Sequence, residues 1–252
     1  MTGTDDRFEQ LFFEAFEALP RQGPGSLACT EQALRSCGEL PDRARILDLG
    51  CGTGAQTLHL AELCNGSIVA VDRHSPNVER LGAEVASRGL QGRIQPLVAD
   101  ATRLGFAPER FDLIWSEGAL YGIGLERAFA ICHRFLRPGG RLAFTDAVWR
   151  TPEPPAEVRA IFEAEYPTMG RVEDVLAALE RAKFTPISHF PLPDEAWWDE
   201  FYGPLEQRIE SLRRTYAGDP DALAALDRLA QEPAMHRRHG ATYGYEFFVA
   251  RR

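Results

Sequence analysis

The chain has 252 residues, enough for one large α/β domain with an appended cap. Its formal net charge of −9 and isoelectric point of about 5.3 argue against a general nucleic-acid binder, which needs basic surface to neutralise phosphates. No apolar run approaches the roughly 18 residues that a membrane span requires, and the first nine residues are polar, unlike a signal peptide. The five cysteines are an odd number without a Cys-x-x-Cys pair, so we expect a cytoplasmic protein with no disulfide framework and no metal site.

Hydrophobic spacing predicts the elements in chain order. Residues 6–19 carry apolar side chains at helical spacing and should form an amphipathic helix. The stretch 20–25 is a loop by composition, and Ser26 is a candidate N-cap for a helix to about residue 36. From residue 45 the pattern alternates, which predicts βαβ units and a parallel sheet. The predicted strands are 45–49, 67–71, 93–98, 111–115 and 140–147, and the predicted helices are 55–64, 75–88 and 123–136.

Beyond residue 150 the character of the chain changes. A proline-rich stretch at 151–155 must be irregular or the first turn of a helix. Residues 156–165, 172–182 and 195–232 look helical, and the last of these segments contains several aromatic residues. A weak strand is predicted at 184–190 and a final strand at 243–250.

Residues 46–54 hold the most informative pattern, a short apolar strand followed by three alternating glycines. Gly50, Gly52 and Gly54 let the backbone turn sharply and approach a ligand closely. The helix that follows presents its N-terminus to the same place. The G-x-G-x-G spacing differs from the dinucleotide fingerprint G-x-G-x-x-G, and Asp48 beside the loop suits a ligand with an ammonium group better than one with two phosphates.

This segment resembles motif I of the class I S-adenosylmethionine-dependent methyltransferases, and further segments agree in order. Residues 69–72 and 97–101 are strands that end in an acid, residues 111–118 resemble motif IV, and residues 135–142 match the helix-turn-strand before the fifth strand. The resemblance implies an α/β fold, a doubly wound, mostly parallel, seven-stranded Rossmann-like sheet with helical cap elements. It also implies S-adenosyl-L-methionine as the cofactor.

The resemblance further implies residues that bind the cofactor. Asp72 would accept hydrogen bonds from the ribose, and Asp100 with the backbone of Ala101 would bind the adenine. The N-terminal segment would fold over the methionine end, where Arg21 would pair with the carboxylate; a simple connector is the alternative. The full predicted set is Arg21, Gly23, Asp48, Gly50, Gly52, Gly54, Asp72, Arg73, Asp100, Ala101 and Ser116.

Acceptor-side residues are sought at the end of the fourth strand and in the cap. Glu117 is the first candidate for a catalytic role, with Tyr121 one helical turn away; the alternatives for Glu117 are a helix cap or a cofactor contact. Aromatic residues could line the acceptor pocket or form a cage for a methylammonium group, and ordinary packing is the alternative. The substrate candidates are Trp149, Trp197, Trp198 and Tyr202.

The sequence therefore predicts methyl transfer to a small-molecule acceptor, with an amine favoured and no nucleic-acid or membrane partner. Ser116-Glu117-Gly118-Ala119 stands where nucleic-acid and protein N-methyltransferases often carry an Asn/Asp-Pro-Pro-aromatic run. The alternatives are a non-catalytic nucleoside-binding protein and a methyltransferase acting on RNA or protein, while the glycine spacing opposes an NAD-type oxidoreductase. The expected parts of the single domain are a helical lid (1–38), a cofactor-binding core (39–150), cap and substrate elements (151–239) and the last strand (240–252).

Overall fold

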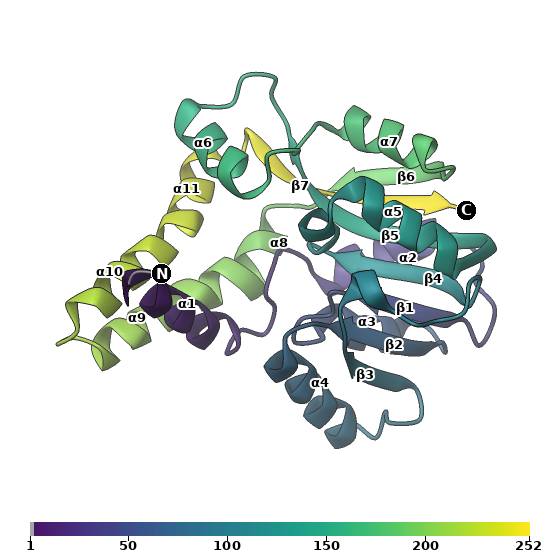
Figure 1. The fold of residues 1–252 in the computed structure, drawn as a ribbon, viewed down its shortest axis with the longest axis horizontal. Helices are drawn as coiled ribbons and strands as arrows, with labels where there is room; N and C mark the ends of the chain where they lie inside the picture. The colour runs from purple at the N-terminus through teal and green to yellow at the C-terminus, as the bar shows by residue number, and fades with distance from the viewer. Residues whose placement is uncertain (1–2) are drawn as a thin grey trace.

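The computed structural model describes residues 3–252, with side chains from residue 6 onward. Within this part of the chain a seven-stranded sheet has the order β3-β2-β1-β4-β5-β7-β6 (Figure 1). β7 runs antiparallel to both of its neighbours, and the other strands of the central sheet pair in parallel. The strands are β1 Arg45–Leu49, β2 Ser67–Asp72, β3 Ile94–Val98, β4 Phe111–Glu117, β5 Leu136–Trp149, β6 Thr185–Pro191 and β7 Tyr243–Arg251.

Helices cover both faces of this sheet, as the alternating pattern predicts. One face packs against α2 Leu27–Ser36, α3 Ala55–Leu63 and α4 Ser75–Ser87, through a core that includes Leu60, Leu81 and Trp115. The other face packs against α5 Leu125–Phe135 and α7 Val172–Arg181, through Phe129 and Phe144. The predicted doubly wound, Rossmann-like fold is thus confirmed.

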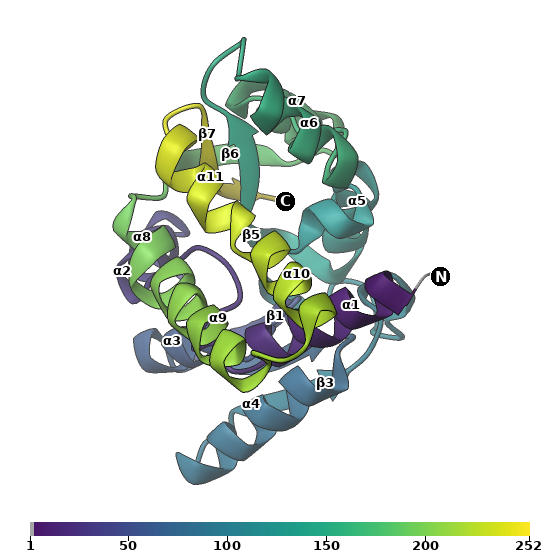
Figure 2. The same ribbon diagram turned by 90° about the vertical axis from the view of Figure 1, so that its left-hand side faces the viewer.

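The remaining helices form a separate apolar cluster beyond the carboxyl ends of the strands. They are α1 Gly3–Phe16, α6 Ala156–Glu165, the short α8 Glu195–Trp197, α9 Gly203–Thr215, α10 Pro220–Leu229 and α11 Gln231–His239. In Figure 2, α1 lies beside α9 and α10, although about 200 residues separate them in the chain. An ion pair of 2.6 Å between Arg7 and Asp219 joins α1 to the N-cap of α10. The N-terminal helix and the cap therefore make one helical layer.

The segment 195–232 is helical over most of its length, as expected, but it is divided into several helices. A π-helical turn, Trp198–Tyr202, follows α8, and the chain breaks again before Asp219, whose side chain accepts a hydrogen bond of 3.0 Å from the backbone N–H of Ala222. Pro220 then begins α10, because proline is well tolerated in the first turn of a helix but not in its interior. Helix α11 was not predicted to extend to His239.

The strand order reverses between β1 and β4, which lie side by side in parallel. In open α/β sheets, ligands bind in the crevice outside the carboxyl ends of the strands at this point. The fold thus places the glycine loop after β1, the acid that ends β2 and the segment after β4 around one crevice. None of the helices described here has the length and apolar character needed to cross a membrane.

Candidate functional site

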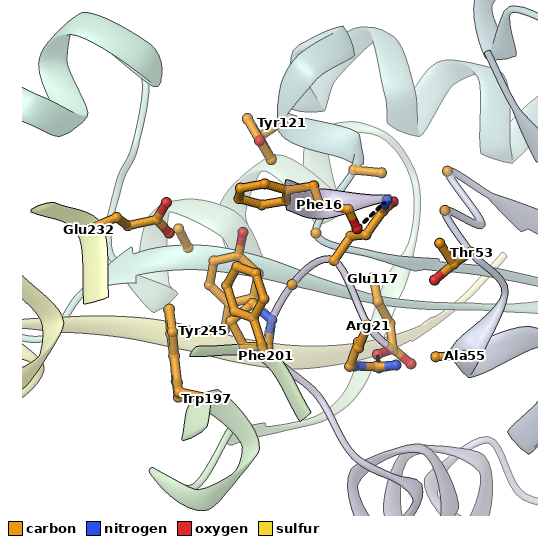
Figure 3. A pocket seen from close by; sticks show the side chains of 18 of the residues that line it. Phe16, Arg21, Thr53, Ala55, Glu117, Tyr121, Trp197, Phe201, Glu232 and Tyr245 are labelled. Atoms are coloured by element: carbon orange, nitrogen blue, oxygen red, sulfur yellow. Dashed lines mark hydrogen bonds and ion pairs between the residues drawn. The ribbon is translucent and has the colours of Figure 1, made fainter. Parts of the chain in front are cut away.

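A cavity of about 490 Å³ lies at the carboxyl ends of the strands and extends toward the helical layer. Figure 3 shows its two ends: Thr53 and Ala55 of the glycine loop on one side, and Glu232, Trp197 and Tyr245 on the other. We call the first the glycine-loop end, formed by residues 21–24, 50–53, 55, 56, 72–74 and 77. We call the second the tyrosine end, which is lined by Tyr121, Tyr166, Tyr202, Tyr243 and Tyr245.

The glycine loop is held against β2 and the segment after β4. The backbone N–H of Gly50 donates to the carbonyl of Val71 at 2.8 Å. Gly50 has a φ of +73°, and a side chain there would collide with the Cβ of Ala119. Only glycine therefore allows this turn and this close approach.

Asp72 organises the loop at its base. Its Oδ2 accepts a hydrogen bond of 2.9 Å from the backbone N–H of Gly52, and its Oδ1 accepts one of 2.8 Å from that of His74. The carboxylate also lines the cavity. It is therefore positioned both to fix the loop and to accept a hydrogen bond from a ligand.

Asp48 lies beneath the loop and is completely buried. Thr57 donates to it at 2.6 Å and Gln56 at 3.4 Å, both from the first turns of α3. Burial raises the pKa of Asp48 to about 7, against these hydrogen bonds, which lower it. Asp48 does not line the cavity, so the structure places it in support of the loop.

A buried ion pair joins the N-terminal segment to the end of β4. Arg21 donates to Oε2 of Glu117, and their side chains are 3% and 4% exposed. The other oxygen of Glu117 accepts a hydrogen bond of 2.8 Å from Nε1 of Trp115. The Nε and Nη1 atoms of Arg21 are buried and have no hydrogen-bond partner among the described residues. Both members of the pair line the cavity.

The N-terminal segment on both sides of Arg21 is bonded to the glycine-loop end. The side-chain amides of Gln22 and Asn77 exchange two hydrogen bonds of 2.9 and 2.8 Å, and Gln22 also donates to the carbonyl of Phe16 at 3.1 Å. The ring of Phe13 stacks on His74 with 4.5 Å between their centroids. These contacts hold the N-terminal segment against the glycine-loop end of the cavity.

Aromatic rings and carboxylates together form the tyrosine end. The hydroxyl of Tyr202 donates to Oε1 of Glu232 at 2.8 Å, and that of Tyr166 donates to Oδ2 of Asp146 at 2.7 Å. Burial raises the pKa of Asp146 to about 7. The other residues that line this end of the cavity are Ala147, Ile161, Phe162, Glu165, Trp197, Phe201, Glu232 and Met235.

Many of the predicted site residues meet in this cavity. Those that line it are Arg21, Gly23, Gly50, Gly52, Asp72, Arg73, Glu117, Tyr121, Trp197 and Tyr202. Tyr166, Glu165 and Glu232 were missed, because they come from the cap and only its folding brings them to the strand ends. The sequence signal that could have found them is modest: each carries an acid or a hydroxyl at the end of a predicted helix.

Other predicted residues lie outside the lining: Asp48, Gly54, Asp100, Ala101, Ser116, Trp149 and Trp198. Asp100 caps the short helical turn at Ala101–Arg103 by accepting from the backbone N–H of Thr102 at 2.8 Å. The buried hydroxyl of Ser116 donates to the carbonyl of Leu49 at 2.7 Å and ties β4 to β1. These two side chains satisfy the backbone around them.

The two tryptophans and Gly54 also have structural partners. Trp149 donates from its indole nitrogen to the carbonyl of Met169 at 3.0 Å, and Trp198 packs its ring under the guanidinium of Arg237 at 4.4 Å. Gly54 begins α3 with a φ of +92°, packed closely against Leu81. In this structure these three residues contact other parts of the protein rather than the cavity.

Comparison with known proteins identifies the family. A family model described as a methyltransferase domain matches residues 46–140. The O-methyltransferase rstn1 of Aspergillus nomiae is 31% identical over 173 residues, which cover 66% of this chain and 76% of that protein. The chain belongs to the class I S-adenosylmethionine-dependent methyltransferases.

Further relatives agree with this membership. The methyltransferase is 31% identical over 140 residues to the uncharacterized methyltransferase YodH of Bacillus subtilis; the match covers 56% of this chain but only 58% of that relative. Its fold is shared with a methyltransferase from Geobacter sulfurreducens, solved in complex with S-adenosyl-L-homocysteine, at a TM-score of 0.81 and 19% identity, over 96% of this chain and 97% of that one. The cavity of this methyltransferase lies at the strand ends of that shared fold.

Proposed function

We propose that this methyltransferase transfers the methyl group of S-adenosylmethionine to a small-molecule acceptor that enters the tyrosine end of the cavity. The observation that carries the proposal is the buried ion pair of Arg21 and Glu117 beside the glycine loop. Two nitrogens of Arg21 lack partners in the described part of the chain, and leaving buried donors unsatisfied costs free energy. A ligand carboxylate would satisfy them, so the residues present fit an amino-acid moiety.

Each end of the cofactor has a matching group in this chain. Arg21 would bind the carboxylate of the methionine moiety, and Glu117 would accept hydrogen bonds from its ammonium group. Asp72, at the end of β2, would accept from the ribose hydroxyls. When bound, S-adenosylmethionine supplies an electrophilic methyl group on a sulfonium, so the task of the protein is alignment.

This arrangement favours a cofactor contact for Glu117 over the catalytic role expected from the sequence. The guanidinium of Arg21 compensates the charge of the carboxylate, and the indole of Trp115 occupies its other oxygen. Both oxygens of the carboxylate therefore already have partners within the protein. Tyr121, which lines the tyrosine end, stays a candidate for contact with the acceptor.

The acceptor side supports a small molecule. The aromatic walls of the tyrosine end would exclude water from the reacting atoms. The net charge of −9 disfavours RNA as the acceptor. The free cysteines are in keeping with the cytoplasmic location that we also propose.

Calorimetric titration with S-adenosylmethionine tests the proposal. The change of Arg21→Gln should weaken binding by at least about ten-fold, the loss of one hydrogen bond to a charged group. The matched control is Arg35→Gln, because Arg35 is 64% exposed on α2 and pairs only with Glu31. Equal affinities of wild type and Arg21→Gln would contradict the assignment of the cofactor site.

Turnover needs a separate measurement. Release of S-adenosylhomocysteine should be detected with at least one member of a panel of amines, phenols, thiols and carboxylic acids. Tight binding of the cofactor without release in any of these classes would instead support the alternative of a nucleoside-binding protein without catalysis.

A further inference from the structure

Two carboxylates, Glu165 and Glu232, line the tyrosine end, and a third, Asp146, is buried behind it and bonded to Tyr166. Asp146, Glu165 and Glu232 take part in no ion pair with a basic side chain among the described residues. The basic groups of the lining lie at the glycine-loop end, where Arg21 is paired with Glu117 and His74 contacts Glu17 at 2.7 Å. None of the three acids is therefore neutralised by a direct ion pair, and Arg73 is the lining cation whose charge opposes theirs at Tyr121.

These carboxylates converge on Tyr121. Its pKa is raised first by burial and then by the charges of Glu232, Glu165 and Asp146. The positive charge of Arg73 lowers the pKa of the same hydroxyl. Three acids from β5, α6 and α11 thus act on one point in the cavity.

Glu232 is the acid best placed to meet a ligand. It lies in the first turn of α11 and lines the cavity, and Figure 3 shows it at one side of the cavity, across from Phe201 and Tyr245. Glu232 is an exposed residue, and its carboxylate accepts a hydrogen bond of 2.8 Å from the hydroxyl of Tyr202 on the wall of the cavity. Burial and the charge of Glu165 raise its pKa, and the hydrogen bond from Tyr202 lowers it. A carboxylate in such a place is stabilised by a cation supplied from outside the protein.

The walls around Glu232 also suit a cation. The rings of Trp197, Phe201 and Tyr202 line the same end, with centroids of Trp197 and Tyr202 5.6 Å apart and those of Phe201 and Tyr202 4.6 Å apart. Aromatic faces attract ammonium groups, most strongly where water is excluded. A metal ion is a poor match, because the part of the chain described here contains no cluster of three or more His, Cys, Asp or Glu that could hold one.

We infer that the acceptor carries a basic amine, and that the tyrosine end receives its ammonium form, with Glu232 as the anionic partner and the aromatic rings as walls. The inference rests on the proposed function, since it assigns the chemical class of the acceptor for the same cavity. It identifies the charged group of the acceptor and leaves open which of its atoms is methylated.

Two probes of one shape test the inference. 2-Phenylethylamine carries an ammonium group where 2-phenylethanol carries a hydroxyl. Each compound is titrated calorimetrically into protein saturated with S-adenosylhomocysteine. We expect the amine to bind at least about ten-fold more tightly than the alcohol. Glu232→Gln should reduce this preference to about two-fold and leave the affinity for S-adenosylhomocysteine unchanged, because glutamine still accepts the hydrogen bond of Tyr202.

The control is Glu163→Gln, which makes the same substitution two residues before Glu165. Glu163 is exposed on α6 and does not line the cavity, so the preference for the amine should persist. Should Glu232→Gln fail to fold, Glu165→Gln removes a second negative charge from the tyrosine end, on α6 instead of α11. It should lower the preference by a smaller factor, about three-fold.

Several outcomes would overturn the inference. Equal binding of the two probes, tighter binding of the alcohol, or binding of neither to protein that holds S-adenosylhomocysteine would each show that this end does not select a cation; the proposed function would then stand. A loss of affinity for S-adenosylhomocysteine in Glu232→Gln would move Glu232 to the cofactor side and also overturn it. If wild type failed to bind S-adenosylhomocysteine, the proposed function would fail and the inference with it.

Discussion

Replacing Glu117 by glutamine should separate the two consequences of the buried ion pair. Both side chains are nearly inaccessible, so the substitution leaves the guanidinium of Arg21 buried without a counter-charge. Removing one partner of a buried pair typically costs about 3–5 kcal/mol. Glutamine keeps an oxygen for the indole of Trp115, and so we expect the lower end of this range, about 3 kcal/mol. At roughly 2–4 °C per kcal/mol for a chain of this size, Tm should fall by about 6–12 °C.

The same substitution should weaken cofactor binding. If Glu117 accepts from the ammonium of the methionine moiety, the loss of a hydrogen bond between charged groups corresponds to about 1.5–3 kcal/mol. This is a decrease in affinity of roughly 10- to 150-fold. Bound S-adenosylhomocysteine should accordingly raise Tm less in the variant than in wild type.

Thermal unfolding with and without S-adenosylhomocysteine, together with calorimetry, measures both effects. Glu84→Gln is a suitable control, because Glu84 pairs with Arg88 on the surface of α4, where both side chains are more than 40% exposed. Such an exposed ion pair contributes about 0–1 kcal/mol to the free energy of unfolding, so the control should leave Tm almost unchanged. A Glu117→Gln variant with the Tm and cofactor affinity of wild type would refute the reasoning. Unchanged affinity with reduced turnover would return Glu117 to the role of proton acceptor.

The remaining predictions concern the cofactor end. Asp72→Ala should weaken S-adenosylmethionine binding by about 1–3 kcal/mol in calorimetry, and unchanged affinity would contradict the ribose role. The pKa of Asp48 is about 7 in the folded state and roughly 3.9 in the unfolded state, so the stability of wild type falls as the pH rises from about 4 to 7. The Tm of Asp48→Asn should therefore rise relative to that of wild type between pH 5 and pH 8. Parallel Tm profiles of the two proteins over this pH range would contradict the burial of the charge. Gly25→Ala places a methyl group 2.6 Å from Cζ of Arg21 and should reduce the affinity for S-adenosylmethionine at least about ten-fold. The control Gly38→Ala also lies at a positive φ but faces open space, so it should lower only Tm. Equal cofactor affinities of the two variants would count against the binding of the cofactor carboxylate by Arg21.

The core of the fold could be predicted because its signals are local. Each strand from β1 to β4 is a short apolar run, and Gly50 marks the first turn through a conformation that few other residues adopt. Ser26 caps α2 as expected, with its hydroxyl accepting from the backbone N–H of Cys29. In contrast, the break before Asp219 interrupts an otherwise continuous helical pattern, and helical spacing alone does not reveal it. The Gly218-Asp219-Pro220 sequence contains the signals of a cap and a first-turn proline, and could have indicated it.

Strand ends gave the most direct signals for residues of the cavity, whereas Arg21, Trp197 and Tyr202 were expected there from the N-terminal segment and the cap. Asp72 and Glu117 each end a strand that the periodicity locates. Asp100 ends a strand in the same way, yet its carboxylate caps the next turn, and sequence cannot distinguish a cap from a ligand contact. Glu232 and Tyr166 reach the cavity from the cap, so only the packing of the helical layer on the sheet brings them there.

Phe16, at the end of α1, touches both halves of the cavity. Its ring lies edge-on to Phe201, with centroids 6.0 Å apart, and its carbonyl accepts from Gln22, which bonds to Asn77 beside the glycine loop. Phe16 therefore contacts residues of both halves, and a coupling between ligands bound in the two halves would pass through it. Thermodynamic linkage then requires reciprocity: if the nucleoside raises the affinity for an acceptor by some factor, the acceptor raises the affinity for the nucleoside by that same factor.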